Sequence, residues 1–215
     1  MPNTPKENQR AKQAFALVFT KYGSYLNGQK VAIFHKLSVG DAEVIFKFME
    51  EEQFLINYQM TSKVAKGCQI NAFTDHLNKA VGANPMPVIY VNRAKATPTT
   101  LVHELLHFFT HDNFRNQVHA AMNEAATEYF TRKLVLVAHV KETSGDMKVK
   151  QFADFDEDRS LIYPKEHSDL VRARNFGQMD PRWKKKSGVL KRAYFQGDIA
   201  AINLLKEAFQ VMGYQ

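Results

Sequence analysis

The chain has a single cysteine and no long apolar run, and each absence limits what it can be. With Cys68 as the lone cysteine among 215 residues, no disulfide can form within the chain. The longest apolar stretch, Leu134 to Val140 with His139 inside it, is too short to cross a bilayer as a helix. The first residues, MPNTPKENQR, lack the apolar region of a secretory signal. We therefore expect cytoplasmic synthesis without a signal peptide or transmembrane segment, and any export by a non-classical route.

The composition is that of a folded globular protein. Hydrophobic residues make up 45% of the chain and charged residues 24%, so it can bury a core and is not disordered. The length predicts one domain over residues 1–215. We expect a flexible tail at 1–8, an N-terminal helical part at 9–85, a central core at 86–140 and a C-terminal helical part at 141–215.

Apolar periodicity and capping residues predict an α+β fold that is mainly helical. The expected helices cover about residues 9–26, 41–58, 69–81, 97–112, 118–140, 163–176 and 189–212, with a polar turn at 113–117 and an interruption near 197–198. Short strands are expected at 31–34 and 86–92. Pro85 and Pro87 suggest that the second strand lies at a sheet edge.

The motif that carries chemistry is His-Glu-Leu-Leu-His at residues 103–107. Residues at i and i+4 of a helix point in nearly the same direction, so His103 and His107 can bind one metal ion. Glu104 lies beside that face and can reach a water on the ion. This pattern arises by chance in about 2% of sequences with this chain's His and Glu content, so it is informative.

Together with a second motif, NEAATE at residues 123–128, HELLH resembles the glutamate-zincins, or gluzincins, the thermolysin-like group of zinc metallopeptidases. The resemblance covers about residues 86–136. It implies a zincin-like core with a short sheet and an active-site helix pair. It also implies one Zn²⁺ per chain, bound by three residues: His103, His107 and Glu124.

The same resemblance assigns two further carboxylates. Glu104 becomes the general base that takes a proton from the zinc-activated water and delivers it to the leaving amine. Glu128 becomes the acid that orients a ligand histidine, and its place one turn after Glu124 agrees with this role. His111 and His119 are weaker candidates for the third ligand. A straight helix cannot wrap His103, His107 and His111 around one ion, and His119 has no motif around it.

A peptidase also needs a group that stabilises the tetrahedral oxyanion and a surface that binds the substrate. For the oxyanion we prefer Tyr163, because Tyr-Pro at a helix start can project a phenol into a cleft. The other candidates are His167, Arg172, Arg174 and Tyr194. The strand Val88–Val91 is expected to bind an extended peptide by edge pairing.

These features predict a zinc metallopeptidase that acts on a protein or peptide substrate. Its small size and basic charge fit a self-contained protease module. The resemblance implies the rest, because modules of this kind occur as toxins or delivered effectors that an inhibitory or immunity partner restrains. One alternative is a zinc-containing binding or sensor module without proteolysis, and another is zinc-dependent cleavage of an amide in a cell-wall peptide. The net charge of +7 also permits a nucleic-acid binder that uses the basic residues 182–192 and Trp183, although short basic runs are commonly only solvated.

Overall fold

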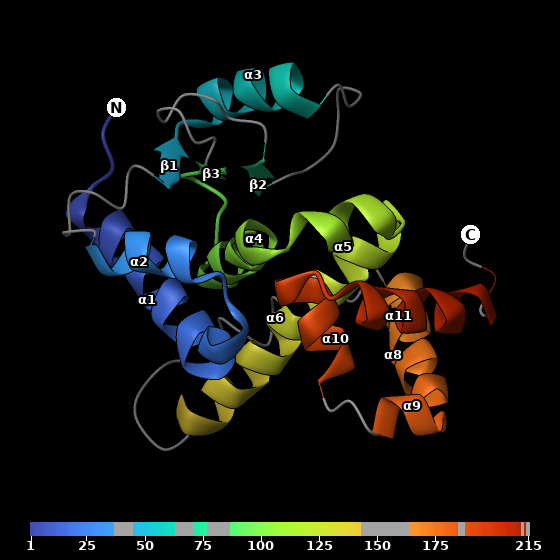
Figure 1. Cartoon of the computed structure of the whole chain (residues 1–215). Coiled ribbons are helices and arrows are strands. Elements are labelled where there is room, and N and C mark those ends of the chain that lie inside the picture. Colours follow the sequence, from blue (N-terminus) through green and yellow to red (C-terminus); the bar gives the residue numbers. More distant parts are fainter. Residues whose placement is uncertain are drawn as a thin grey trace. The chain divides into compact units, whose positions relative to one another are not determined.

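The computed structural model describes residues 1–36, 45–62, 71–76, 87–142, 164–184, 188–211 and 213 (Figure 1). The chain divides into two compact units. The first unit comprises Met1–Lys21 and Gly28–Phe108, and the second comprises Tyr22–Asn27 and Phe109–Gln215. The single domain over residues 1–215 stays a prediction.

The described elements are mainly helical, with one small sheet, so the α+β class is confirmed. In the first unit they are α1 (Pro5–Tyr22), α2 (Gly28–Lys36), β1 (Phe46–Met49), α3 (Glu51–Ser62), β2 (Ala72–Asp75), β3 (Val88–Asn92) and α4 (Pro98–Phe109); the last residues of α1 and α4 belong to the second unit. In the second unit they are the 3₁₀ turn η1 (Gly23–Tyr25), α5 (Asp112–Gln117), α6 (Ala120–Glu142), α8 (Pro164–Gln178), α9 (Pro181–Lys184), α10 (Val189–Lys191), the π-helical turn η3 (Arg192–Gln196) and α11 (Ile199–Val211).

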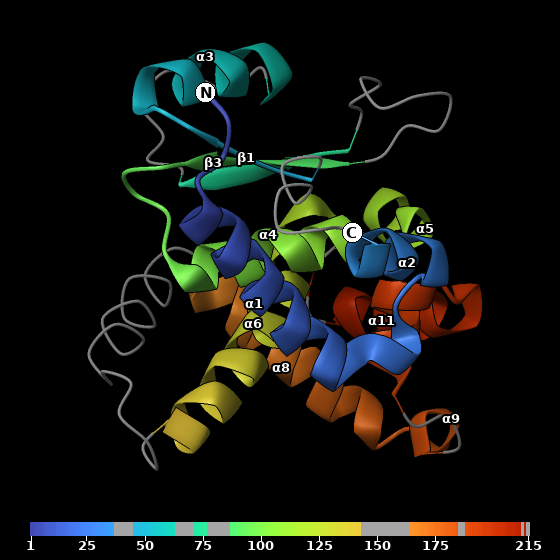
Figure 2. The same ribbon diagram turned by 90° about the vertical axis from the view of Figure 1, so that its left-hand side faces the viewer.

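The sheet of the first unit has the strand order β1-β3-β2. β3 is parallel to β1, with Phe46 opposite Ile89, and antiparallel to β2, with Thr74 opposite Ile89. Figure 2 shows α3 over one face of the sheet and α1 and α4 over the other. Because both faces are covered, all five residues of β3 are buried.

Apolar side chains fill both faces of this sheet. Beneath α3, Phe54 packs with Val88 and Tyr90. On the face toward α4, the Phe34 ring lies 6.5 Å from the Phe46 ring and 5.8 Å from the Phe108 ring, measured between centroids. α4 is thereby anchored against a packed apolar layer.

The structure corrects three of the predicted elements near the sheet. Phe46–Met49 and Ala72–Asp75 are strands, although helices were expected over 41–58 and 69–81; residues 51–58 of the first are helical, within α3. Burial in β1 alternates between buried and half-buried residues, which is the period of a strand. Residues 31–34 belong to helix α2 instead of a strand. Apolar runs of four or five residues suit either structure, and tertiary packing decides between them.

The position of β3 also corrects an expectation. The strand itself is confirmed at Val88–Asn92, but it is the central strand of the sheet and not an edge. Its hydrogen-bonding edges are occupied by β1 and β2, so it has no edge to offer a substrate peptide. The prolines that suggested an edge precede the strand and do not interrupt its ladder.

The N-terminal residues are not a frayed tail, because α1 already begins at Pro5. The Thr4 hydroxyl accepts a hydrogen bond from Glu7 N–H at 3.2 Å, and Thr4 N–H donates to Glu7 Oε2 at 2.6 Å, which is a capping box. Arg93 Nε also donates to Glu7 Oε1 at 2.7 Å. Burial alone would raise the pKa of Glu7, but the hydrogen bonds from Thr4 and Arg93 hold this pKa below its usual value.

In the second unit, the aromatic side chains of Tyr22, Phe130, Tyr194 and Phe195 form a buried cluster. The predicted interruption near 197–198 is confirmed, since Gly197 has φ +63° and separates η3 from α11. The expected polar turn at 113–117 is instead the short helix α5.

Candidate metal centre

Helix α4 carries the HELLH motif, and its start is fixed by local hydrogen bonds. The Thr97 hydroxyl accepts from Thr100 N–H at 3.2 Å, and Pro98 occupies the first helical position, as the sequence predicted. The side chains of the motif are well covered: His103 is 6%, Glu104 8% and His107 7% exposed. A water-poor surround of this kind strengthens electrostatic interactions inside a site.

The two histidines point their Nε2 atoms at each other across 3.1 Å. Two nitrogens at that separation, each about 2.05 Å from a common ion, would subtend an angle of about 100° at the ion, close to tetrahedral. The distance also suits a hydrogen bond between the rings in one tautomer. The separation of the two nitrogens is therefore compatible with one tetrahedral ion.

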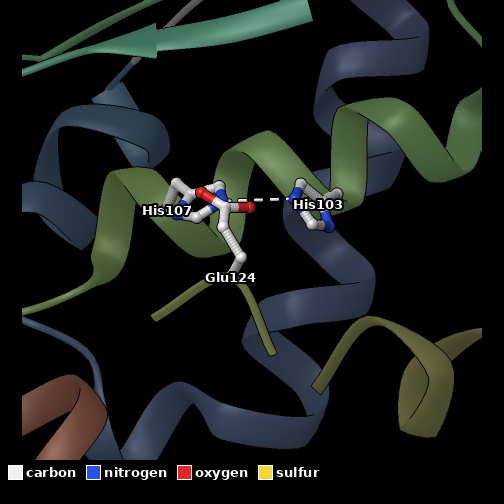
Figure 3. Close-up of side chains that lie close together, drawn as sticks. All are labelled: His103, His107 and Glu124. Carbon is white, nitrogen blue, oxygen red and sulfur yellow. Dashed lines mark hydrogen bonds between the residues drawn. The ribbon is translucent and has the colours of Figure 1, made fainter. Parts of the chain in front are cut away.

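Glu124 lies in the first turns of α6 and is half-buried. One ligand atom from each of His103, His107 and Glu124 lies within 4.8 Å of the other two, and Figure 3 shows the three side chains. The three residues that the two motifs together predicted as ligands are thus brought together. Two imidazole nitrogens and one carboxylate oxygen form a donor set that suits a transition metal.

Glu104 is held by a residue that the sequence did not indicate. Thr74 Oγ1, on strand β2, lies 2.9 Å from Glu104 Oε2 and 3.0 Å from the Glu104 carbonyl oxygen. The hydroxyl can donate its proton to either oxygen. No local signal indicated this contact, because residues 72–75 lie within the helix expected over 69–81 and their burial does not alternate.

Glu128 is fully buried on α6, and Arg132 Nε donates to its Oε1 at 2.8 Å. Arg132 was not singled out in the sequence, although the i, i+4 spacing of an acid and a base is a recognisable helix pair. The role of Glu128 in orienting a ligand histidine stays a prediction.

The two histidines that are alternative third ligands, His111 and His119, each cap the start of a helix. His111 Nδ1 accepts from Asn113 N–H at 3.1 Å at the start of α5. His119 Nδ1 accepts from Ala121 N–H at 3.2 Å at the start of α6. Each ring therefore has a structural use outside the ligand group.

Three of the five oxyanion candidates have a hydrogen-bond or ion-pair partner in the structure, and their role in the reaction stays a prediction. Tyr194 is fully buried in the aromatic cluster, and its hydroxyl lies 2.6 Å from Thr127 Oγ1. Arg174 donates to the Tyr129 hydroxyl, and Arg172 lies 3.6 Å from Asp169 on its own helix. Two candidates lie outside what the structure describes: the whole of Tyr163 and the side chain of His167.

The basic cluster has structural partners in its described part. Trp183 is 8% exposed and packs so closely on Gly177 that a Cβ there would lie 2.5 Å from the indole. Arg182 pairs with Asp180 and Glu207 at 2.6 Å each, and Arg192 pairs with Asp198 at 3.1 Å. The indole is therefore not an open stacking platform for bases.

Comparison with known proteins adds no family to this picture. No protein-family model, curated protein or solved structure matches the chain. Within the described residues, no helix combines the length and apolar character needed to cross a membrane.

Proposed function

We propose that this chain is a zinc-dependent peptidase with a zincin-like core, in which His103, His107 and Glu124 bind the metal. The observation that carries the proposal is the grouping of these three ligand atoms within 4.8 Å of one another. Glu104, the expected general base, adjoins the first ligand on the same helix and is nearly buried. The resemblance of the two motifs to gluzincins agrees with this assignment.

The donor set favours zinc over the hard cations. Ca²⁺ and Mg²⁺ prefer oxygen ligands, whereas imidazole suits Zn²⁺ and other late transition metals. Two histidines and one glutamate also leave a tetrahedral ion one open position, which distinguishes a catalytic from a structural zinc site.

The chemistry follows from the residues around that position. A bound zinc ion supplies a Lewis acid that lowers the pKa of water and polarises a carbonyl. Glu104 accepts the proton of the attacking water and passes it to the leaving amine. The buried surround of α4 limits access of bulk water, so this proton transfer takes place between fixed groups.

Strand β2 is the better candidate for binding an extended substrate. Among the described strands it lies at one edge of the sheet, and a strand edge presents N–H and C=O groups that a peptide can pair with. Its residue Thr74 contacts Glu104, so a peptide along β2 would run beside the general base.

Two alternatives have less support. A structural or sensory zinc site has no use for a buried carboxylate beside the ligands, and Glu104 is such a group. A nucleic-acid binder of this kind would need an open aromatic face and arginines that are not neutralised by acids, but Trp183 is packed on Gly177 and the exposed Arg182 is paired with two acids.

Metal analysis combined with hydrolysis of fluorescein-labelled casein tests the proposal. The purified chain should hold about one zinc, and His103→Ala should lose it. Glu104→Gln should keep the metal and lose hydrolysis by about 10²- to 10⁴-fold. Absence of zinc after reconstitution would refute the metal site, and full turnover by Glu104→Gln would refute the role of the base.

A further inference from the structure

We propose that Thr74 is the residue that positions the general base Glu104, a role that rests on the proposed peptidase function. Thr74 is a positioning residue and not a catalytic one, because it acts through the carboxylate of Glu104. Its hydroxyl lies 2.9 Å from Glu104 Oε2 and 3.0 Å from the Glu104 carbonyl.

The sheet register explains why this hydroxyl faces α4. Thr74 is opposite Ile89 in the antiparallel pair, and paired residues in such a ladder point to the same face. Phe73, one residue earlier, points to the other face and packs on Tyr90 and Phe54. A shift of β2 by one residue would exchange these two side chains, so the strand pairing determines the contact.

The contact restricts how the carboxylate of Glu104 can turn. A glutamate side chain has three rotatable bonds, and a general base must present one oxygen at a defined place. A hydrogen bond from Thr74 to Oε2 holds this oxygen and leaves Oε1 to receive the proton of the attacking water. The second possible acceptor, the Glu104 carbonyl, ties the same hydroxyl to the backbone of α4.

The position on β2 links this role to substrate binding. β2 lies at an edge of the described sheet, so a peptide that pairs with it lies against the strand that holds the base. Thr74 thereby sets the distance between the substrate-binding edge and Glu104. A misplacement of about 1 Å at a catalytic group can lower the rate by about 10²-fold.

Steady-state kinetics on fluorescein-labelled casein, with zinc content measured in parallel, tests the role. Thr74→Val keeps the shape of the side chain but removes the hydroxyl, and Thr74→Ser keeps the hydroxyl. We expect Thr74→Val to lower kcat by about 10- to 100-fold with KM within about twofold and zinc content unchanged. Thr74→Ser should restore kcat to within about threefold of the native value.

A second measurement needs no turnover. In the metal-free protein, the urea midpoints of Thr74→Val, Glu104→Ala and the double variant form a cycle. We expect non-additive shifts, because each single substitution removes the same hydrogen bond.

The outcomes separate the two proposals. If the native chain hydrolyses casein and Thr74→Val does so at the native kcat, the positioning role is overturned. An equal loss of kcat in Thr74→Ser and Thr74→Val also overturns the positioning role, because the hydroxyl would then be irrelevant. A chain that binds zinc and cleaves no peptide removes the proposed function itself, and the role of Thr74 with it, whatever the cycle shows.

Discussion

Gly197 separates η3 from α11 at a point where a methyl group has no room. Its φ is +63°, and a Cβ there would lie 2.1 Å from Nδ1 of His111 and 2.5 Å from two of its ring carbons. His111 Nδ1 is also the atom that caps α5 by accepting from Asn113 N–H at 3.1 Å. Gly197→Ala therefore combines a strained backbone with the displacement of a helix cap.

The expected cost can be assembled from these two effects. A residue with a Cβ in the left-handed region loses about 1–2 kcal/mol, and loss of an N-cap costs about 1 kcal/mol. Their sum, about 2.5 kcal/mol, should lower the melting temperature of a chain of this size by roughly 5–10 °C.

Thermal unfolding followed by circular dichroism measures this effect, and two other glycines provide controls. Gly213 has φ +82° and would place a Cβ with no atom within 4 Å, and Gly28 has open space as well. Gly213→Ala should lower the free energy of unfolding by no more than the backbone strain of about 1–2 kcal/mol. Gly28→Ala should leave the free energy of unfolding almost unchanged. In a His111→Ala background, Gly197→Ala should lose only the part of the stability that comes from backbone strain, because the cap is already absent. Equal shifts for Gly197→Ala and Gly213→Ala would refute the steric argument.

Four further outcomes are expected. Glu124→Ala should lose most of its bound zinc because one of three ligands is gone. Unchanged metal content would show that a residue other than Glu124 is the third ligand. His111→Ala should keep native zinc content, since its ring serves as a cap; loss of zinc would make it a ligand. Tyr194→Phe should leave kcat within about twofold. It should lower the free energy of unfolding by about 1–2 kcal/mol through the lost hydrogen bond to Thr127, measured by urea unfolding. A large fall in kcat would indicate that Tyr194 takes part in the reaction. Glu7 has a lowered pKa in the folded protein, so its ionised form contributes stability above its unfolded pKa of 4.5, and this contribution is lost as the pH falls through the lower folded value. Glu7→Gln should therefore reduce the fall in the free energy of unfolding at acidic pH, measured by urea unfolding at a series of pH values. The same fall in the variant and the native chain would contradict this.

Local sequence was sufficient for the helices that carry the candidate site. The cap at Thr97, the proline after it and the i, i+4 spacing of His103 and His107 act within one helix, so they can be read without knowledge of the fold. Gly197 likewise ends a helix by its own backbone conformation. These features depend on interactions between near neighbours in the chain.

Tertiary structure decided what depends on pairing between distant segments. Residues 46–49 and 72–75 become strands because β3 offers both of its edges to them, and a run of four residues has too few local contacts to select a helix or a strand. The same pairing makes β3 central and brings Thr74 to Glu104, thirty positions away in the sequence. The sequence by itself therefore determined which residues could bind a metal and on which helices they lie. Only the tertiary structure decided which strand lies at the edge and which hydroxyl holds the base, because strand register is set by contacts across the sheet.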